Sequence, residues 1–430
     1  MKLTLCLVTP AAVVFFAACL LPIATARETD SANSYSFEDF VVDFGKSYES
    51  KDEYERKRRI FEQNVEKIIR HNSKHSLHSK PSYTLGINHF ADLSEEELPL
   101  GLDKSSLYYG PYYMKSSVVP LESVIRRNLR QGSDHHHHHH HRPPSSPVSF
   151  DIQTLPETVD WRSRGDVVTT PIKNQGGCGS CWAFASVGAL ESHIAINTGK
   201  LLEMSVQELV SCTPNPQSCG GSGGCTGSTA EIAYAWVAQH GMLEEWRFGY
   251  QSFHGEKVNC TILNNQDKSG VIDGAIASIA GFANLPMNSY NAMMYAVATM
   301  GPVVVNVAAT GWGLYKGGIF DDDDLDQRDI NHAVVLEGYG KDEETGQLFW
   351  LIRNSWSSLW GEDGRIRLKR VDPSSLDDPS SDCKIDVSPA DGIACTKDKS
   401  GKPVAPANVT VCGTSGVLFD GVIPIGGHLL

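Results

Sequence analysis

The chain has 430 residues, and 37 Lys and Arg against 51 Asp and Glu give it a formal net charge of −14. With 41% hydrophobic and 9% aromatic residues it can build a packed core, which excludes disorder as a global description. The acidic balance argues against nucleic acid as a partner, because phosphate binding depends on clustered Lys and Arg. Eleven cysteines are too many for an ordinary cytosolic enzyme and indicate an oxidising compartment.

The first 26 residues have the features of a secretory signal peptide. Lys2 supplies a positive start, residues 3–21 form an apolar run, and Ala24, Thr25 and Ala26 fit a small-residue cleavage site. A membrane anchor is the competing interpretation, since the run is near the length that spans a bilayer. We favour the signal peptide, and expect the remaining chain to lie in the secretory lumen or outside the cell, without contact to a membrane.

Residues 36–72 are predicted to be helical, because apolar side chains recur among dense charge. Residues 108–147 show neither a helical nor a strand period and are predicted to form an exposed linker. This linker contains seven consecutive histidines, at 135–141. Histidine gains charge between pH 8 and 5, so the run is either a pH trigger that loosens the first part of the chain from the acidic second part, or a low-complexity or tag sequence without function.

The second part of the chain, from Leu155 onward, carries nearly all of the acidity: 19 basic and 32 acidic residues give −13, and residues 1–154 carry −1. Helices are predicted from about Cys181, around 205–212 and around 229–239. Strands are predicted at 303–307, 333–339, 349–353 and 364–368. Helices that precede strands suggest an α+β protein in which a helical lobe packs against a sheet lobe.

Residues 175–184, with the sequence Gln-Gly-Gly-Cys-Gly-Ser-Cys-Trp-Ala-Phe, carry the strongest chemical signal. A cysteine at a helix start is favoured as a thiolate, because unpaired N–H groups and the helix dipole stabilise the anion. Without Cys6 and Cys19 of the signal peptide nine cysteines remain, so at least one thiol is left unpaired. Cys181 is the best candidate. A nucleophile of this kind needs an imidazole and a group that orients it, and His332 at the start of one strand and Asn354 at the end of another fit that order.

These residues make the chain resemble a papain-like cysteine protease of the cathepsin L-like kind, in its preproenzyme form. The resemblance covers residues 37–90 and residue 155 to the C-terminus. It implies a two-lobed α+β fold, with a helical left lobe, an antiparallel β-barrel-like right lobe and an N-terminal helical inhibitory propeptide. It also implies the domains, which are a signal peptide at 1–26, a propeptide at 27–154 with its inhibitor domain at about 36–95, and a peptidase domain at 155–430 with an insertion at about 372–413.

The resemblance also implies what each site residue does. Cys181 is expected to be the nucleophile, His332 the general base and acid, and Asn354 the group that orients the imidazole. The Gln175 side chain and the Cys181 backbone N–H would stabilise the oxyanion, while Trp356 would shield the bond between Asn354 and His332 from water. The family's resting pair is a thiolate and an imidazolium, which lets His332 protonate the leaving amine. No cofactor and no metal are expected.

The first part resembles the family's inhibitory propeptide through two motifs. A helix motif and a following extended motif appear in the expected order, except that Lys57 stands where an arginine is expected and so lacks the fork of donors. The matching residues are Glu53, Ile60, Phe61, Asn64, Ile68 and Asn72 in the helix and Gly86, Asn88, Phe90 and Asp92 in the extended motif. We therefore expect this part to cover the cleft until it is removed, near residue 155.

The disulfides are implied by the resemblance, with one ambiguity. The family's Cys-x-Gly-Gly segment can be matched at Cys219 or at Cys225, and we prefer Cys225 because a helix then follows at the usual distance. On that register Cys178 pairs with Cys225 and Cys212 with Cys260. The disulfide that usually precedes the catalytic histidine is missing, since residues 321–326 contain no cysteine and Ser415 stands in the partner's place. Three pairings of the remaining cysteines are open, and we expect Cys395–Cys412 and Cys219–Cys383.

The same alignment predicts the peptide-binding residues. Gly227 and Ser228 would hydrogen-bond an extended substrate, with Asn331 and Trp356 also lining the site. Asp420 would form the floor of the second specificity subsite, where an acid would accept Arg or Lys two residues before the scissile bond; a surface aspartate is the alternative. The walls of this subsite would be Thr229, Ala230, Ile330 and Ala333.

The sequence therefore predicts a cysteine endopeptidase made as a zymogen, with polypeptide substrates and its own propeptide as inhibitor. We expect a monomer, in a lysosome or acidic vacuole or outside the cell. The alternatives are a catalytically silent binding or storage protein, and an exopeptidase or peptide ligase on the same scaffold. Asn408 and Asn259 begin glycosylation acceptor sequences, and the middle residue of the second, Cys260, is also expected in a disulfide. The aspartates at 321–324 are read as a solvated acidic loop in preference to a cation site.

Overall fold

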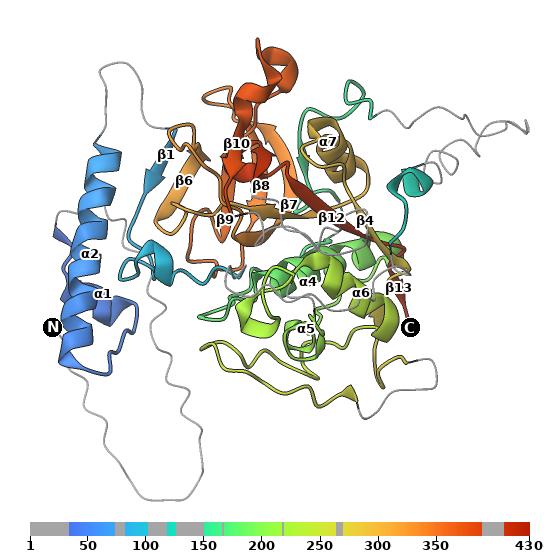
Figure 1. The fold of residues 1–430 in the computed structure, drawn as a ribbon, viewed down its shortest axis with the longest axis horizontal. Helices are drawn as coiled ribbons and strands as arrows, with labels where there is room; N and C mark the ends of the chain where they lie inside the picture. The colour runs from blue at the N-terminus through green and yellow to red at the C-terminus, as the bar shows by residue number, and fades with distance from the viewer. Residues whose placement is uncertain are drawn as a thin grey trace, which may run out of the picture.

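The computed structural model describes residues 34–73, 82–101, 118–125, 150–165, 167–216, 219–263, 270–388 and 408–430. A small N-terminal helical part lies along one edge of a larger body, in which helices pack against a sheet (Figure 1). The predicted signal peptide and the histidine run lie outside the described residues. No helix in the described ranges has both the length and the apolar character needed to cross a membrane.

The N-terminal part consists of two helices in place of the single helical stretch predicted at 36–72. Helix α1 spans Phe37–Asp43 and α2 spans Lys51–Asn72, and the side chains of Ser36 and Ser50 cap their N-termini. Gly45, at φ 59°, lies in the turn between them, where a left-handed backbone favours glycine. An aromatic cluster around Phe37, Phe40 and Phe61 joins the helices. Strand β1 (Tyr83–Leu85) and the short helix η2 (Glu95–Glu97) follow.

The helical layer of the body comes next in the chain, close to the predicted positions. It comprises α4 (Cys181–Thr198), α5 (Val206–Cys212) and α6 (Ala230–His240), with the one-turn helix η4 (Gly224–Thr226) before α6. Ser205 caps α5 through its side chain, and Gly199, at φ 72°, ends α4 in the left-handed conformation. Almost all of α4 is buried, so this helix forms the centre of the molecule.

The main sheet has nine strands in the order β1-β6-β9-β8-β7-β5-β12-β4, with β2 paired to β7. Only the β6–β9 pair is parallel among these pairings. The four predicted strands correspond to β5, β7, β8 and β9. Helix α7 (Tyr290–Thr299) packs on β7. The strands of the body are β2 (Val159–Asp160), β4 (Gly281–Asn284), β5 (Val303–Val307), β6 (Tyr315–Phe320), β7 (His332–Lys341), β8 (Leu348–Arg353), β9 (Arg365–Lys369) and β12 (Asp420–Ile425).

Two short two-stranded sheets lie outside this sheet. Strand β3 (Ala277–Ser278) pairs with β13 (His428–Leu429). Strand β10 (Cys383–Asp386) pairs with β11 (Val409–Cys412), and both belong to the predicted insertion at 372–413, of which residues 389–407 are not described. The one-turn helices η6 (Pro373–Ser375) and η7 (Pro379–Asp382) precede the β10–β11 hairpin, and η8 (Thr414–Gly416) follows it.

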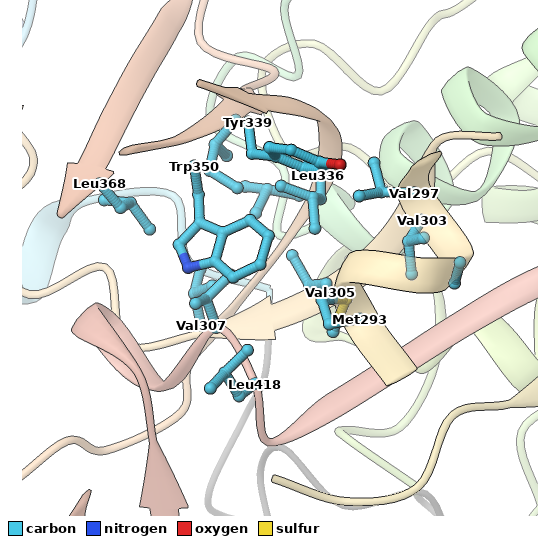
Figure 2. Close-up of a cluster of buried hydrophobic side chains, with 14 of the residues drawn as sticks. Met293, Val297, Val303, Val305, Val307, Leu336, Tyr339, Trp350, Leu368 and Leu418 are labelled. Atoms are coloured by element: carbon cyan, nitrogen blue, oxygen red, sulfur yellow. The ribbon is translucent and has the colours of Figure 1, made fainter. Parts of the chain in front are cut away.

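Two apolar cores fill the body, one on each side of the line where α4 meets the sheet. Figure 2 shows part of the sheet-side core, with the Trp350 ring among Val307, Leu336 and Leu418. Burying an aliphatic or aromatic side chain of this size contributes about 1.5–3 kcal/mol to folding. The α+β class predicted from the order of the elements is confirmed, with the helical layer and the sheet each closed by its own core.

The N-terminal part pairs with strands of the body at both ends of the main sheet. Strand β1 adds to the sheet edge by pairing with β6, with Tyr83 opposite Gly318. At the other end of the sheet, Val118 forms a bridge with Phe282 of β4, and a short helical segment at 121–125 follows it. Figure 1 shows α2 and this segment at opposite sides of the body.

Candidate active site

Cys181 is the first residue of α4 and the one free cysteine among the described residues. Its side chain is fully buried, and its Sγ accepts a hydrogen bond from the Ala333 N–H at 3.4 Å. The contact joins the start of the central helix to the start of β7, so the nucleophile candidate lies where the helical layer meets the sheet. Cys178, three residues before Cys181, forms a disulfide with Cys225, and this bond fixes the loop before α4.

His332 begins β7, and Asn354 directly follows the neighbouring strand β8. His332 Nε2 lies 2.8 Å from Asn354 Oδ1, and the Ser355 N–H donates to the same oxygen at 2.8 Å. Because that oxygen only accepts, Nε2 carries the hydrogen, and His332 Nδ1 remains without a hydrogen-bond partner among the described residues. The Trp356 ring stacks on the imidazole with 4.8 Å between ring centroids, which covers the His332–Asn354 bond.

Gln175 reaches the same site from the loop before α4. Its Oε1 accepts from the Ser355 hydroxyl at 2.6 Å, so its Nε2 faces the opposite direction as a donor. Nε2 donates to the Cys178 carbonyl at 2.9 Å and to the Pro99 carbonyl at 2.7 Å. Ser355 was not predicted as a site residue from the sequence. The one signal that could have indicated it is its position directly after Asn354.

The segment 99–101 of the N-terminal part crosses this site. The Gly101 N–H donates to Cys181 Sγ, and a Cβ added to Gly101 would lie 2.5 Å from that sulfur. The Gly101 carbonyl lies against Gly227 and leaves no room for a Cβ there. The backbone therefore passes so close to the thiol that only glycine fits at position 101.

Burial under this segment shifts the pKa values of both Cys181 and His332. Burial raises the pKa of the Cys181 thiol to about 11, although the N–H groups around the sulfur oppose the shift. Burial also lowers the pKa of His332 to about 4, and the Asn354 hydrogen bond only partly offsets it. The covered site therefore favours a neutral thiol and a neutral imidazole, in contrast to the thiolate and imidazolium expected for the family's resting enzyme.

The predicted motifs of the N-terminal part hold the crossing segment in place. Asn64 of α2 donates to the carbonyls of Ala91 and Leu93, both at 2.9 Å, and Asn88 donates to the Gly313 carbonyl of the body at 2.9 Å. The Phe90 ring meets Trp356 edge-on, with 5.2 Å between centroids.

The remaining motif residues each have a local partner. Glu53 accepts from the Glu49 N–H and Asn72 bonds Leu85 in both directions, while Gly86 donates to Leu314. Asp92 pairs with Lys46 at 2.8 Å, and Phe61 and Ile68 are buried in the aromatic cluster. Lys57, which stands where an arginine was expected, pairs with Glu97 at 3.0 Å.

Two of the predicted specificity residues, Asp420 and Ala333, lie in one row across three strands. Asp420 of β12 lies opposite Asn306 of β5, which lies opposite Ala333 of β7. Residues opposite one another on neighbouring strands point to the same face, so the Asp420 and Ala333 side chains share one face of the sheet, two strand spacings or about 10 Å apart. Thr229, Ala230 and Ile330 are buried as well.

A second acid, which the sequence did not indicate, lies beside Asp420. Glu231, in the first turn of α6, accepts from Asn284 at 2.8 Å, and Asp420 accepts from Asn306 at 2.7 Å. Asn284 is opposite Val422, two residues along β12 from Asp420, so both amides lie on one face of the sheet. Burial raises the pKa of each carboxyl, and the nearby Glu231 charge raises that of Asp420 further.

The disulfides correct one expectation. Cys178–Cys225 and Cys212–Cys260 form as the resemblance implied. The expected pairing of Cys383 with Cys219 and of Cys412 with Cys395 is wrong, because Cys383 and Cys412 are bonded to each other. They face one another in the β10–β11 ladder, with Cα atoms 4.0 Å apart, and this register brings the two sulfurs together. Cys219 is disulfide-bonded as well, and Cys395 lies outside the described residues.

Three of the aspartates in the acidic loop before His332 form ion pairs with basic side chains. Asp321 and Asp323 pair with Lys369, and Asp322 pairs with Arg328. The described part of the chain holds no cluster of three or more His, Cys, Asp or Glu side chains that could bind a metal ion.

Comparison with known proteins agrees with this geometry. The sequence model described as "Papain family cysteine protease" matches residues 155–390, and "Cathepsin propeptide inhibitor domain (I29)" matches residues 37–98. Cathepsin S of Bos taurus is 34% identical over 330 residues, 76% of this chain and 85% of that protein. Procathepsin L of Rattus norvegicus is 32% identical over 323 residues, 74% of this chain and 82% of that protein.

A solved structure extends the likeness to the whole fold. Digestive procathepsin L 3 of Tenebrio molitor larval midgut has a TM-score of 0.61 at 26% identity, over 90% of this chain and 97% of that one. The two-lobed fold and the inhibitory N-terminal domain predicted from the sequence are thereby confirmed. The chain belongs to the papain family of cysteine proteases and carries a cathepsin-type propeptide inhibitor domain.

Proposed function

We propose that Cys181, His332, Asn354 and Gln175 carry out peptide-bond hydrolysis in this cysteine endopeptidase. The observation that carries the proposal is the Pro99 carbonyl at 2.7 Å from Gln175 Nε2, beside the buried thiol. A peptide carbonyl already occupies the donor that the oxyanion of a substrate would need. An intact set of nucleophile, base, orienting group and oxyanion donor argues against the alternative of a silent binding protein.

The reaction follows from the chemistry of these groups. The Cys181 thiol gives its proton to His332, and the thiolate attacks the substrate carbonyl carbon, while the negative charge on oxygen is held by the Gln175 amide and the Cys181 N–H. His332 gives its proton to the leaving amine as the C–N bond breaks, leaving a thioester. Water, deprotonated by His332, then releases the acid and restores the thiol. Asn354 keeps the imidazole in one tautomer, so Nδ1 is the nitrogen available for proton transfer.

The propeptide inhibits this machinery by burial and by its chain direction. With Pro99–Gly101 in place, the pKa values of Cys181 (about 11) and His332 (about 4) favour the neutral pair, and removal of the segment would let water stabilise the ion pair. In the proposed subsites, a substrate residue at Gly227 precedes the residue whose carbonyl meets Gln175. Here Gly101, which meets Gly227, follows Pro99, so the segment runs opposite to a substrate.

The role of Cys181 is tested with purified, processed enzyme and a fluorogenic peptide. Cys181→Ser is expected to abolish cleavage, whereas Ser192→Ala, on the same helix but bonded only to the Gly188 carbonyl, is expected to leave it unchanged. Cleavage by the Cys181→Ser enzyme at more than a few per cent of the parent rate would overturn the assignment.

The covering role is tested on the full chain. Gly101→Ala places a methyl group on the Cys181 sulfur and is expected to speed labelling of that thiol by an epoxide trap. Gly249→Ala, where an added Cβ meets its nearest atom at 3.5 Å, is the matched control. Equal labelling of the Gly101→Ala and parent chains would contradict the covering role.

We propose that the Asp420–Glu231 pair lets the second specificity subsite accept Arg or Lys. Two carboxyls on the face shared with Ala333 supply the charge, and the amides of Asn306 and Asn284 orient them. Because the pKa of each carboxyl is raised, the pair gains negative charge as pH rises. The ratio of kcat/KM for Arg over Leu at that substrate position should rise with pH and fall in Asp420→Ala. A ratio unchanged by Asp420→Ala would leave Asp420 with a structural role only.

We further propose that the chain enters the secretory pathway through residues 1–26 and matures by cleavage near residue 155, in a lysosomal or extracellular setting. The disulfides Cys178–Cys225, Cys212–Cys260 and Cys383–Cys412 support an oxidising compartment. Asn259 and Asn408 are exposed, as a glycan would require. Sequencing the N-terminus of the secreted and acid-treated forms tests both cleavage sites.

A further inference from the structure

The loop that leads into His332 is held by a buried arginine. Arg328 has 1% of its surface exposed, and its guanidinium bonds both oxygens of Asp322 at 2.8 Å. Its Nη1 also donates to the Asp382 carbonyl at 2.5 Å, at the base of the β10–β11 hairpin. Asp322 accepts the Ser415 N–H at 2.9 Å as well. The Arg328–Asp322 pair thus ties the loop to the residues on both sides of the hairpin.

The hairpin itself runs alongside the same loop. Gln327 bridges to Ile385 of β10, and the Arg328 N–H donates to the Ile385 carbonyl at 3.1 Å. One residue further, Asp386 is fully buried, and its Oδ2 accepts the Ile330 N–H at 3.2 Å. The Cys383–Cys412 disulfide closes the base of the hairpin. The backbone of the loop is therefore fixed up to Ile330, two residues before the catalytic histidine.

An apolar contact completes this arrangement. Ile330, Val411 of β11 and Phe419 form a small core cluster of their own, separate from the two large cores. A Cβ added to Gly416 would lie 2.7 Å from Ile330 Cδ1, so the isoleucine is closely packed on that side too. Ile330 is held by its backbone through Asp386 and by its side chain through Val411.

We propose that the β10–β11 hairpin sets the apolar wall of the second specificity subsite, with Asp386 and Val411 as positioning residues for Ile330. The assignment rests on the proposed function, in which Ile330 lines that subsite. Neither residue touches substrate; each determines where the Ile330 side chain stands. If this wall is loosened, the preference for the side chain two residues before the scissile bond should change more than the rate of the chemical step. The chemical step is carried out by Cys181 and His332, which the wall does not include.

The test compares kcat and KM for matched peptides with Leu, Phe or Val two residues before the cleaved bond. All rates are normalised to the amount of enzyme whose Cys181 reacts with a stoichiometric thiol trap. Val411→Ala removes support behind Ile330 and is expected to shift the Phe-to-Leu ratio of kcat/KM about 3- to 10-fold towards Phe, mainly through KM. A methylene lost from the pocket itself is worth about tenfold or more, and the shift stays below that because Val411 acts only through Ile330.

The backbone contact is tested with a rescue pair. Asp386→Ala should shift the ratio in the same direction as Val411→Ala, and Asp386→Asn should restore it, because the amide oxygen can still accept the Ile330 N–H. Ile385→Ala is the matched control, since that side chain is 39% exposed on the same strand. If Asp386→Ala does not fold, Val411→Ala and Asp386→Asn decide the question.

Three results would overturn the proposal. A uniform fall in kcat/KM for all three peptides, with the Phe-to-Leu ratio unchanged in Val411→Ala, would reduce the hairpin to a structural support. A ratio that Ile385→Ala shifts as much as Val411→Ala would remove the role of the Val411 side chain. A parent enzyme whose trapped thiol is intact but which cleaves none of the peptides would overturn the proposed function, and this assignment with it.

Discussion

The two halves of the active site are held by different kinds of bond. The loop and helices around Cys181 are fastened by two disulfides, Cys178–Cys225 and Cys212–Cys260, which join residues 47 and 48 positions apart. Residues 321–332, which lead to His332, contain no cysteine, and the buried Arg328–Asp322 pair fixes them together with the β10–β11 hairpin. The disulfides constrain the unfolded chain, whereas the ion pair depends on both partners staying charged. The imidazole half should therefore respond to single substitutions and to pH in ways that the thiol half does not.

The largest expected effect belongs to the thiol half and concerns chemistry. Gln175→Ala removes a donor to the oxyanion and is expected to lower kcat by about 10²- to 10³-fold. KM should change little, because the lost bond forms mainly in the transition state. Steady-state kinetics of trap-titrated enzyme measure this, with the exposed Gln251→Ala as control. A loss below tenfold would exclude Gln175 as an oxyanion donor.

The next effect tests the ionic support of the imidazole half. Arg328→Met leaves Asp322 buried without its partner and should lower the free energy of unfolding by about 3–5 kcal/mol. The double variant Arg328→Met with Asp322→Leu should regain much of that loss, since no unpaired charge remains. Urea unfolding of both variants in the Cys181→Ser chain, which cannot cleave itself, measures the difference. Equal stability of the single variant and the parent would refute the role of this pair.

A somewhat smaller loss is expected from the covalent support. Replacing Cys212 and Cys260 with Ser should cost about 2–4 kcal/mol, through the greater freedom of the unfolded chain. Because neither serine titrates, the loss should be the same at pH 4.5 and pH 7. A loss that varies strongly between the two pH values would contradict the contrast drawn between the two halves.

The smallest expected effect is the pH dependence that Asp382, at the base of the hairpin, gives to the free energy of unfolding. Burial and the nearby Asp322 and Asp323 raise the pKa of Asp382 to about 6, although Arg328 opposes this. A carboxyl whose pKa is raised on folding binds more protons in the folded than in the unfolded state. Its stabilisation of the folded state is therefore complete below about pH 4 and is lost as pH rises through 6. Asp382→Asn keeps the carbonyl that Arg328 uses and should flatten this part of the stability profile. An unchanged slope between pH 4 and 6 would assign it to other groups.

The same contrast explains what the sequence could predict. The segment 175–184 carries a nucleophile, a helix start and an oxyanion donor within ten residues, so local pattern was enough. The strands at 303–307, 333–339 and 349–353 were predicted because buried strands give continuous apolar runs, and the strand at 364–368 was predicted because apolar and charged residues alternate along it. Residues 36–72 were predicted as one helical stretch because apolar residues recur on both sides of Gly45, but α1 ends at Asp43 and α2 begins at Lys51.

The imidazole half could not be predicted in the same way. Arg328 and Asp386 are 58 positions apart, and neither has a local pattern that marks it as buried. The hairpin lies in the insertion at 372–413, for which the resemblance offered no template, and the wrong disulfide assignment arose there too. Glu231 was missed because an acid in the first turn of a helix reads as an exposed partner of the helix dipole.

The most direct test of the account is the rate at which an epoxide thiol trap labels Cys181 before and after removal of the propeptide. The full chain at pH 7 should label slowly, because Pro99–Gly101 cover the sulfur and burial raises its pKa. After incubation at pH 4.5 with mild reductant and loss of about 154 residues, labelling of Cys181 should be fast and accompanied by peptidase activity. A Cys181 that stays unlabelled once the propeptide has been removed, or that labels equally fast before and after, would contradict the account.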